Sequence, residues 1–318
     1  MARRAVLSLL ACAAMTACTS SATQPAGQSP SASPASLACR LPVDASTYIG
    51  SGEPPGGWIT LPGGHFVRDP ASAEGRLSSH VPSYDRALGR WVPVEANFVA
   101  PDGATYVLTN EQSVGRDFYL VDAATGARHF LLSGDGPSQA PASWTVVTYA
   151  TEGIYLWSTG IGTIPGLWLL DPRSGAVRLV DGSHYWGWVS GGFAWADDPA
   201  FGGTATTYKV YRLDLRTGAV TTWYDGAAPA RMLSPTPEGR ALVEVGDIGK
   251  EQIELLTAPN QLVVLDVPSA FQADFALVAS PGVWLVGRQS GVALYRPGHD
   301  TLVVALGVQI VDVAGGCY

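Results

Sequence analysis

The chain is poor in charged side chains, and above all in lysine. Only 14% of its 318 residues are charged, and Lys209 and Lys250 are the only lysines beside 17 arginines. The basic residues are scattered along the chain, and the formal net charge is -8. Because binding nucleic-acid phosphates needs a concentrated basic face, we expect no nucleic-acid partner.

Helical periodicity is also missing beyond the amino terminus. After roughly the first twenty residues, no long segment repeats its apolar positions at helical spacing, whereas the chain contains 37 Gly, 23 Pro, 10 Trp and 12 Tyr. Short apolar segments between Gly- and Pro-containing turns are typical of β-strands. With 47% hydrophobic residues the chain can form one large core. The sequence therefore predicts an all-β protein with one folded domain.

Motifs for catalysis and metal binding are absent as well. No serine lies in a G-x-S-x-G motif, and the five histidines show no H-x-H or H-E-x-x-H spacing. The segment from Gly246 to Lys250 has the wrong spacing for a phosphate-binding loop. We therefore expect no metal and no cofactor, and binding rather than catalysis.

The amino terminus has the layout of an export signal. Arg3 and Arg4 precede an apolar stretch that is too short to span a bilayer, so we expect residues 1–17 to be removed. The following M-T-A-C sequence resembles the lipobox of bacterial lipoproteins, which implies that Cys18 is acylated; ordinary secretion after Ala17 is the alternative. Residues 18–38 are uncharged and rich in Ser, Pro and Ala, as in flexible tethers. We expect a membrane-anchored lipoprotein with residues 39–318 folded outside the cytoplasm.

The remaining cysteines predict a disulfide. The chain has four Cys, and removal of the signal with acylation of Cys18 leaves Cys39 and Cys317 as thiols. They lie at the two ends of the folded region in an oxidising compartment, where paired cysteines are the rule. We expect them to be bonded, with two free thiols as the alternative.

A hairpin pattern recurs along the domain. It is clearest at Leu167–Val180, where two alternating apolar segments flank a D-x-x-S-G turn. Further copies lie at Tyr119–Leu132 and Tyr211–Tyr224, a weaker one at Ser83–Val94, and eroded ones at Leu262–Ala270 and Ala293–Val303. A second hairpin with a turn such as P-D-G or P-E-G precedes each of the last five copies. Two hairpins per repeat make four antiparallel strands, the size of one propeller blade.

These turns resemble those of the WD-repeat-like propellers of the TolB type, over residues 57–313. The resemblance implies the fold and an extracytoplasmic binding role, and it assigns no catalytic residue. Six hairpin copies predict six blades; seven is the alternative if Gly57–Asp69 and the last strand form an extra sheet. We expect Val308–Val313 to join the amino-terminal strands and thereby close the ring.

The candidate site residues lie in and near four long connections. These are residues 110–117, 158–166, 197–207 and 246–260, and the alternation of antiparallel strands places them on one face of the propeller. The candidate ligand-binding acids there are Glu111, Asp117, Asp197 and Asp198, and the candidate aromatic residues are Trp157, in a predicted strand, and Tyr185 and Trp186, at the start of the fourth inner strand. The acids could also be ordinary solvated loop residues, and the aromatic residues could form core between blades instead of a stacking surface.

Two functions fit this pattern. The first is a monomeric, tethered propeller that binds a protein, peptide or glycan without catalysis. The alternative is an extracytoplasmic polysaccharide hydrolase or lyase that uses loop carboxylates as acid and base. Two acids from different blades, facing each other across the channel with perturbed pKa values, would favour the alternative.

Overall fold

In the computed structural model of the chain, two compact units are present, residues 1–35 and 36–318. All described residues belong to the second unit. They are residues 37–45, 54–73, 82–110, 117–132, 143–159, 166–198, 207–247, 249–267, 271–287, 291–297, 302–304, 310 and 312–318. Among them, no helix is long and apolar enough to cross a membrane. Glu111 lies outside the described residues.

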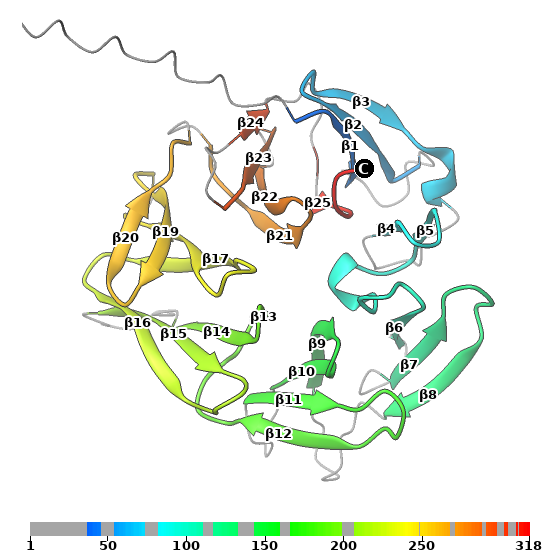
Figure 1. Cartoon of the computed structure of the whole chain (residues 1–318), viewed down its shortest axis with the longest axis horizontal. Coiled ribbons are helices and arrows are strands. Elements are labelled where there is room, and N and C mark those ends of the chain that lie inside the picture. The colour runs from blue at the N-terminus through cyan, green and yellow to red at the C-terminus, as the bar shows by residue number, and fades with distance from the viewer. Residues whose placement is uncertain are drawn as a thin grey trace, which may run out of the picture. The chain divides into compact units, whose positions relative to one another are not determined.

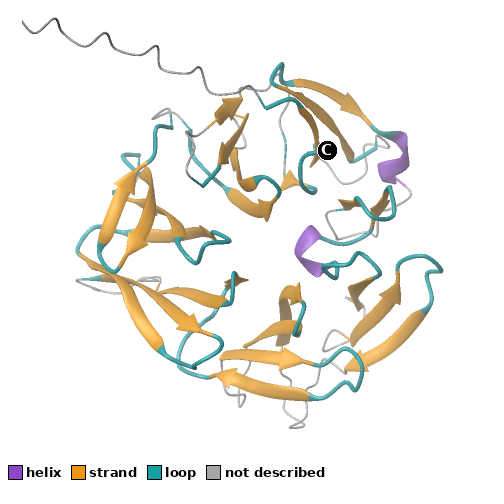
Figure 2. Ribbon diagram, in the orientation of Figure 1, coloured by secondary structure: helices purple, strands orange, loops and turns teal. Residues whose placement is uncertain are grey.

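The domain is a six-bladed, all-β propeller of antiparallel sheets, which confirms the predicted fold class and blade number (Figures 1 and 2). Each blade is named here in chain order, and its strands are given from the channel outwards. Blade 1 contains β25 (Asp312–Val313), β1 (Cys39–Asp44), β2 (Gly56–Leu61) and β3 (His65–Arg68). Blade 2 contains β6 (Thr105–Asn110), β7 (Asp117–Asp122) and β8 (Arg128–Leu132), and a bridge between Val99 and Tyr106 extends it inwards.

The other four blades are regular four-stranded sheets. Blade 3 contains β9 (Ser143–Ala150), β10 (Gly153–Thr159), β11 (Gly166–Leu170) and β12 (Val177–Asp181). Blade 4 contains β13 (Trp188–Ser190), β14 (Phe193–Asp198), β15 (Tyr208–Asp214) and β16 (Val220–Gly226). Blade 5 contains β17 (Ala230–Pro235), β18 (Ala241–Val245), β19 (Gln252–Ala258) and β20 (Gln261–Val264), and blade 6 contains β21 (Phe275–Ala279), β22 (Gly282–Gly287), β23 (Gly291–Tyr295) and β24 (Leu302–Val304).

The hairpin at residues 83–94 is not part of a blade. Its strands β4 (Ser83–Asp85) and β5 (Arg90–Val92) form a two-stranded sheet that follows blade 1 in the chain. Two short 3₁₀ helices flank it, η1 (Pro70–Ala73) and η2 (Ala96–Phe98). The predicted strands near residues 57–68 are the outer pair of blade 1, so this hairpin is an insertion between blades 1 and 2.

The outer hairpin of blade 5 differs from the prediction. The sequence pattern placed it at Leu262–Ala270 with Asp266 in the turn, but β19 and β20 turn at Asn260, whose φ is 56°. Asn tolerates this left-handed conformation better than most residues. The predicted long loop at residues 246–260 is also wrong, because β19 runs through it from Gln252 to Ala258.

Apolar side chains fill the joints between neighbouring blades. In the joint of blades 3 and 4, for example, Tyr155 and Leu167 pack with Trp186, Ala194 and Leu213. Equivalent clusters join blades 2 and 3, blades 4 and 5, blades 5 and 6, and blades 6 and 1. Burial of these sheet faces supplies the main stabilisation, at about 25 cal/mol per Å² of apolar area.

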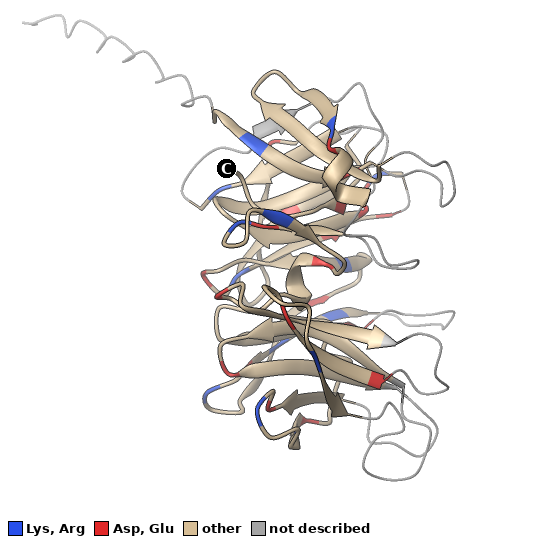
Figure 3. Cartoon of the chain, turned by 90° about the vertical axis from the view of Figure 1, so that its right-hand side faces the viewer, with Lys and Arg blue, Asp and Glu red and all other residues tan. Residues whose placement is uncertain are grey.

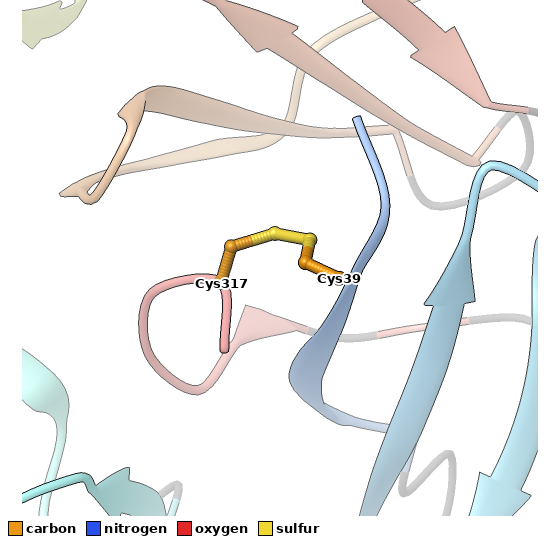
Figure 4. The surroundings of a disulfide bond; sticks show 2 residues. All are labelled: Cys39 and Cys317. Carbon is orange, nitrogen blue, oxygen red and sulfur yellow. A yellow bond between two sulfur atoms is a disulfide. The ribbon is translucent and has the colours of Figure 1, made fainter. Parts of the chain in front are cut away.

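The two ends of the domain meet in blade 1. Val43 pairs with Val313, and the backbone N–H groups of Arg40 and Tyr318 donate to each other's carbonyl oxygens over 3.0 Å. A disulfide joins Cys39 to Cys317, with 5.7 Å between the Cα atoms (Figure 4). The predicted disulfide is thereby confirmed.

An aromatic cluster fastens the inserted hairpin to blade 1. The ring of Trp58 lies edge-on to Tyr84, Trp91 and Tyr318, at centroid distances of 4.6, 6.0 and 5.8 Å. The indole N–H groups of Trp58 and Trp91 both donate to Asp69 Oδ2, over 2.9 and 3.0 Å. This joint thus consists of aromatic rings around one carboxylate that accepts hydrogen bonds from two of them.

Candidate binding surface

Several predicted site residues gather where blade 3 meets blade 4. The residues there are Trp157, Asp181, His184, Tyr185, Asp198 and Tyr211, which we call the blade 3–4 surface. Trp157 and Asp198 lie near the ends of β10 and β14, and His184 and Tyr185 lie between β12 and β13. In an antiparallel blade these positions share one face, opposite the D-x-x-T-G turns. The binding face predicted from the sequence therefore contains this surface.

Asp181 holds the connection between the two blades. Its Oδ1 accepts hydrogen bonds from the Ser183 backbone N–H over 2.8 Å and from the Trp186 indole N–H over 2.9 Å. Burial alone would raise the pKa of Asp181, but hydrogen bonds from Ser183 and Trp186 outweigh that effect and lower the pKa. The ionised carboxylate thus fixes the loop that presents His184 and Tyr185.

His184 is packed between aromatic rings. Its imidazole stacks on Tyr211 with 3.9 Å between the ring centroids, and it lies edge-on to Trp186 at 5.4 Å. Burial lowers the pKa of His184 more than the nearby carboxylates of Asp181 and Asp198 raise it. At neutral pH the imidazole is therefore neutral, and it can both donate and accept a hydrogen bond.

Tyr185 is the exposed aromatic residue of the surface. Its side chain is 55% exposed, and its ring lies edge-on to Trp157 with 5.7 Å between the centroids. Trp186, the next residue, is fully buried and belongs to the core between the blades. The sequence left open whether these aromatic residues are core or surface, and the structure places one in each.

The described acids of the predicted site, Asp117, Asp197 and Asp198, do not form one group. Asp197 and Asp198 are neighbours on β14 and point to opposite faces. Asp197 Oδ2 accepts the Met232 backbone N–H over 2.9 Å, which links blade 4 to blade 5, and burial raises the pKa of Asp197. Asp198 is exposed near His184. Asp117 lies a blade away, at the start of β7.

Sequence reasoning missed three residues of the surface. Asp181 and Tyr211 resembled ordinary strand residues, and His184 was one of five scattered histidines. The dense aromatic run from Tyr185 to Trp188 was the signal nearest to them. Among the described residues, no group of three or more His, Cys, Asp or Glu could hold a metal ion.

Charged residues are dispersed over the domain. Figure 3 shows Lys and Arg interspersed with Asp and Glu on the side it presents. Among the described residues, two ion pairs, Lys209 with Asp225 and Arg231 with Glu244, join cations to acids in neighbouring strands. The blade 3–4 surface therefore presents aromatic rings and carboxylates without a basic patch among the described residues.

Comparison with known proteins supports the fold. No protein-family model and no curated protein matches the chain. TolB from Acinetobacter baumannii superposes with a TM-score of 0.51 at 12% identity, covering 88% of this chain and 66% of the TolB chain. A putative 6-phosphogluconolactonase from Bacteroides fragilis gives a TM-score of 0.47 at 12% identity, with 88% and 98% covered. A puromycin-hydrolysing peptidase of Mycobacterium tuberculosis gives 0.43 at 13%, with 80% and 43% covered. At these identities the likeness concerns fold alone: the chain has a TolB-like β-propeller fold.

Proposed function

We propose that this protein is a propeller tethered outside the cytoplasm through an acylated Cys18, which binds a protein, peptide or glycan partner without catalysis. The blade 3–4 surface is the binding surface. The observation that carries the proposal is Tyr185, an exposed ring held in place by Trp157 and by a hydrogen-bonded loop. Aromatic rings on rigid supports are the residues that contribute most to binding energy at interfaces.

The neighbouring groups suit a partner with apolar and polar parts. The ring of Tyr185 can stack on a sugar ring or an apolar side chain, while Asp198 accepts hydrogen bonds and His184 can donate or accept one. Because this surface lies on rigid blades, binding requires little ordering of the protein. The dispersed charge of the domain agrees with a partner that is not a polyanion.

The test begins with capture of envelope proteins and glycans by the full chain, followed by affinity measurements on the captured partner. We expect Tyr185→Ala to weaken binding at least tenfold and Tyr185→Phe to keep most of it, because the ring supplies the contact area. Phe130→Ala is the matched control, since Phe130 is also exposed, by 59%, but lies on β8 of blade 2. If Phe130→Ala loses as much affinity as Tyr185→Ala, or if Tyr185→Ala loses none, the blade 3–4 surface is not the binding surface.

The hydrolase or lyase remains a second candidate because of one observation. Glu95 and Asp312 come from different parts of the ring, line the central channel and both have raised pKa values. A polysaccharide would have to reach them through a cavity of about 370 Å³, so this candidate stands second. If the protein is a hydrolase or lyase, the full chain should release reducing ends from envelope polysaccharide, and Asp312→Asn should not.

A further inference from the structure

The innermost segments of all six blades face the centre of the ring (Figure 1). They line a central cavity of about 370 Å³. Its wall includes β9, β13, β17, β21 and β25, together with η2 and the start of β4. Ligand pockets of proteins typically have volumes of about 300–1,000 Å³. The cavity is therefore large enough for a small organic molecule.

The charge on the cavity wall has one sign. Glu95 and Asp312 line it, and no described lining residue is Lys, Arg or His. Burial, and then the nearby carboxylates of Glu95 and Asp44, raise the pKa of Asp312 to about 7, although the Val313 backbone N–H donates to it over 2.7 Å. Glu95 is exposed at the cavity wall, and partial burial of its carboxyl by the surrounding protein raises its pKa. A cation in the cavity would relieve this repulsion.

A second observation points to a ligand with hydrogen-bond donors. Ser83 lines the cavity and is 2% exposed, and its buried hydroxyl has no hydrogen-bond partner. Asp85, two residues along β4, is 7% exposed, and its Oδ2 also lacks a partner. Alternate residues of a strand face the same side, and Asp85 lines an adjoining cavity that Ser83 shares. Buried polar groups are usually hydrogen-bonded.

The rest of the wall offers apolar surface. Phe275 is 40% exposed, and Trp188, Tyr149 and Leu277 line the same cavity. Aromatic rings attract cations through their faces and pack on hydrocarbon. The wall thus combines carboxylates, a hydroxyl acceptor and aromatic rings.

From these observations we propose that the central cavity binds an organic ammonium ion with an apolar body. The ammonium group lies between Asp312, Glu95 and the hydroxyl of Ser83, and the body lies against Phe275 and Trp188. This site is separate from the blade 3–4 surface, so neither proposal depends on the other.

Phenethylamine is a suitable probe, because it is a primary ammonium ion with one aromatic ring. Calorimetric titration of the full chain at pH 8 should show saturable binding of phenethylamine. 2-Phenylethanol, which has a similar shape without the charge, should bind at least tenfold more weakly. Asp312→Asn should weaken phenethylamine binding at least tenfold, whereas Asp225→Asn, on the outer strand β16, should not change it.

Dependence on pH supplies a second readout. Phenethylamine stays protonated between pH 6 and pH 8, while Asp312 ionises, with Glu95 and Asp44 as the carboxylates that act on it. The affinity of the unmodified protein for phenethylamine should therefore rise severalfold from pH 6 to pH 8, and that of Asp312→Asn should stay constant. Glu95→Gln, an exposed change that should not impair folding, is expected to weaken binding as well. Absence of phenethylamine binding at millimolar concentration, equal affinity for the alcohol, or full affinity in both variants would overturn the proposal.

Discussion

Two aspartates show how the surroundings of a residue decide its charge. Burial would raise the pKa of Asp69, but hydrogen bonds from Trp91 and Trp58 outweigh it and lower the pKa. Asp312 receives one backbone hydrogen bond and faces other carboxylates, so its pKa rises to about 7. Ionised Asp69 therefore stabilises the joint between blade 1 and the inserted hairpin, whereas ionisation of Asp312 opposes folding.

Asp312→Asn tests this difference. The pKa of Asp312 is about 7 in the folded protein and near 3.8 in the unfolded chain. Titration of Asp312 therefore lowers the free energy of unfolding as pH rises from about 4 to about 7, and above about pH 7 it causes no further change. Asp312→Asn has no carboxyl at this position, so its free energy of unfolding does not fall for this reason. We expect it to be more stable than the unmodified protein by about 1–3 kcal/mol at pH 8 and about equally stable at pH 4, allowing for water in the cavity.

The measurement is urea unfolding of both proteins at several pH values. The difference between them matters, because other carboxylates titrate in both. If Asp312→Asn instead loses stability relative to the unmodified protein as pH rises from 4 to 8, ionised Asp312 stabilises the fold.

At the scale of elements, the outer turns of blades 2, 3 and 4 are built alike. Asp122, Asp171 and Asp214 each accept backbone N–H groups within the turn, and a glycine follows in left-handed conformation. Hydrogen bonds from Thr125 and from Ser174 are the main causes that lower the pKa values of Asp122 and Asp171. The repeated motif in the sequence is therefore the turn chemistry itself.

Two of these glycines form a matched pair. Gly126 and Gly175 have φ values of 73° and 70°, but a Cβ on Gly126 would meet nothing within 4 Å, whereas one on Gly175 would lie 2.9 Å from the Leu131 carbonyl oxygen of blade 2. We expect Gly126→Ala to cost about 1 kcal/mol of stability from backbone strain. Gly175→Ala should cost clearly more, as measured by thermal unfolding. Equal costs would mean that blades 2 and 3 separate easily at this point.

This turn chemistry also explains how far the sequence predicts the fold. Blades 2, 3 and 4 were located correctly because their turns carry the D-x-x-[ST]-G pattern. Only the outer hairpin of blade 5 was misplaced, because its turn uses Pro259 and Asn260, and Asp266 only resembles a turn residue. The hairpin at residues 83–94 has a similar turn but belongs to no blade. The local sequence pattern predicts a hairpin and does not determine which sheet the hairpin joins.

The candidate site was less predictable, for a physical reason. Tyr185 and Trp186 are adjacent and chemically similar, yet opposite orientations make one exposed and the other core. The central cavity brings Ser83 and Glu95 together with Asp312, which follows them by more than 200 residues in the chain. Convergence of this kind is a property of tertiary structure, and a single sequence does not contain it.

At the scale of the molecule, the ring depends on the joint that contains both chain ends. The disulfide of Cys39 and Cys317 closes a loop with a sequence separation of 278, for which the chain-entropy model gives a contribution of up to about 5 kcal/mol. We expect Cys39→Ser with Cys317→Ser to lower the stability by about 2–5 kcal/mol and to lower the melting temperature. Reduction of the unmodified protein should have the same effect, and an unchanged melting temperature would assign the closure to β25 and the aromatic cluster.

Membrane attachment is tested separately. We expect Cys18→Ser protein, expressed in a bacterial host, to lose incorporation of labelled fatty acid and to leave the membrane fraction. Cys12→Ser is the matched control, because Cys12 lies within the expected signal segment and should not affect labelling. Continued labelling of the Cys18 variant would contradict the lipoprotein assignment.

Blade 1 has a consequence for the order of folding. It combines β1, from the start of the domain, with β25, from its end, so the strands of the other five blades are synthesised before the last strand of this one. Until then β1 has no inner partner and presents an open strand edge, which favours association with other chains. Such long-range contacts also slow folding, because the ends of a long loop must find each other. The propeller therefore cannot close before β25 has been synthesised and has paired with β1.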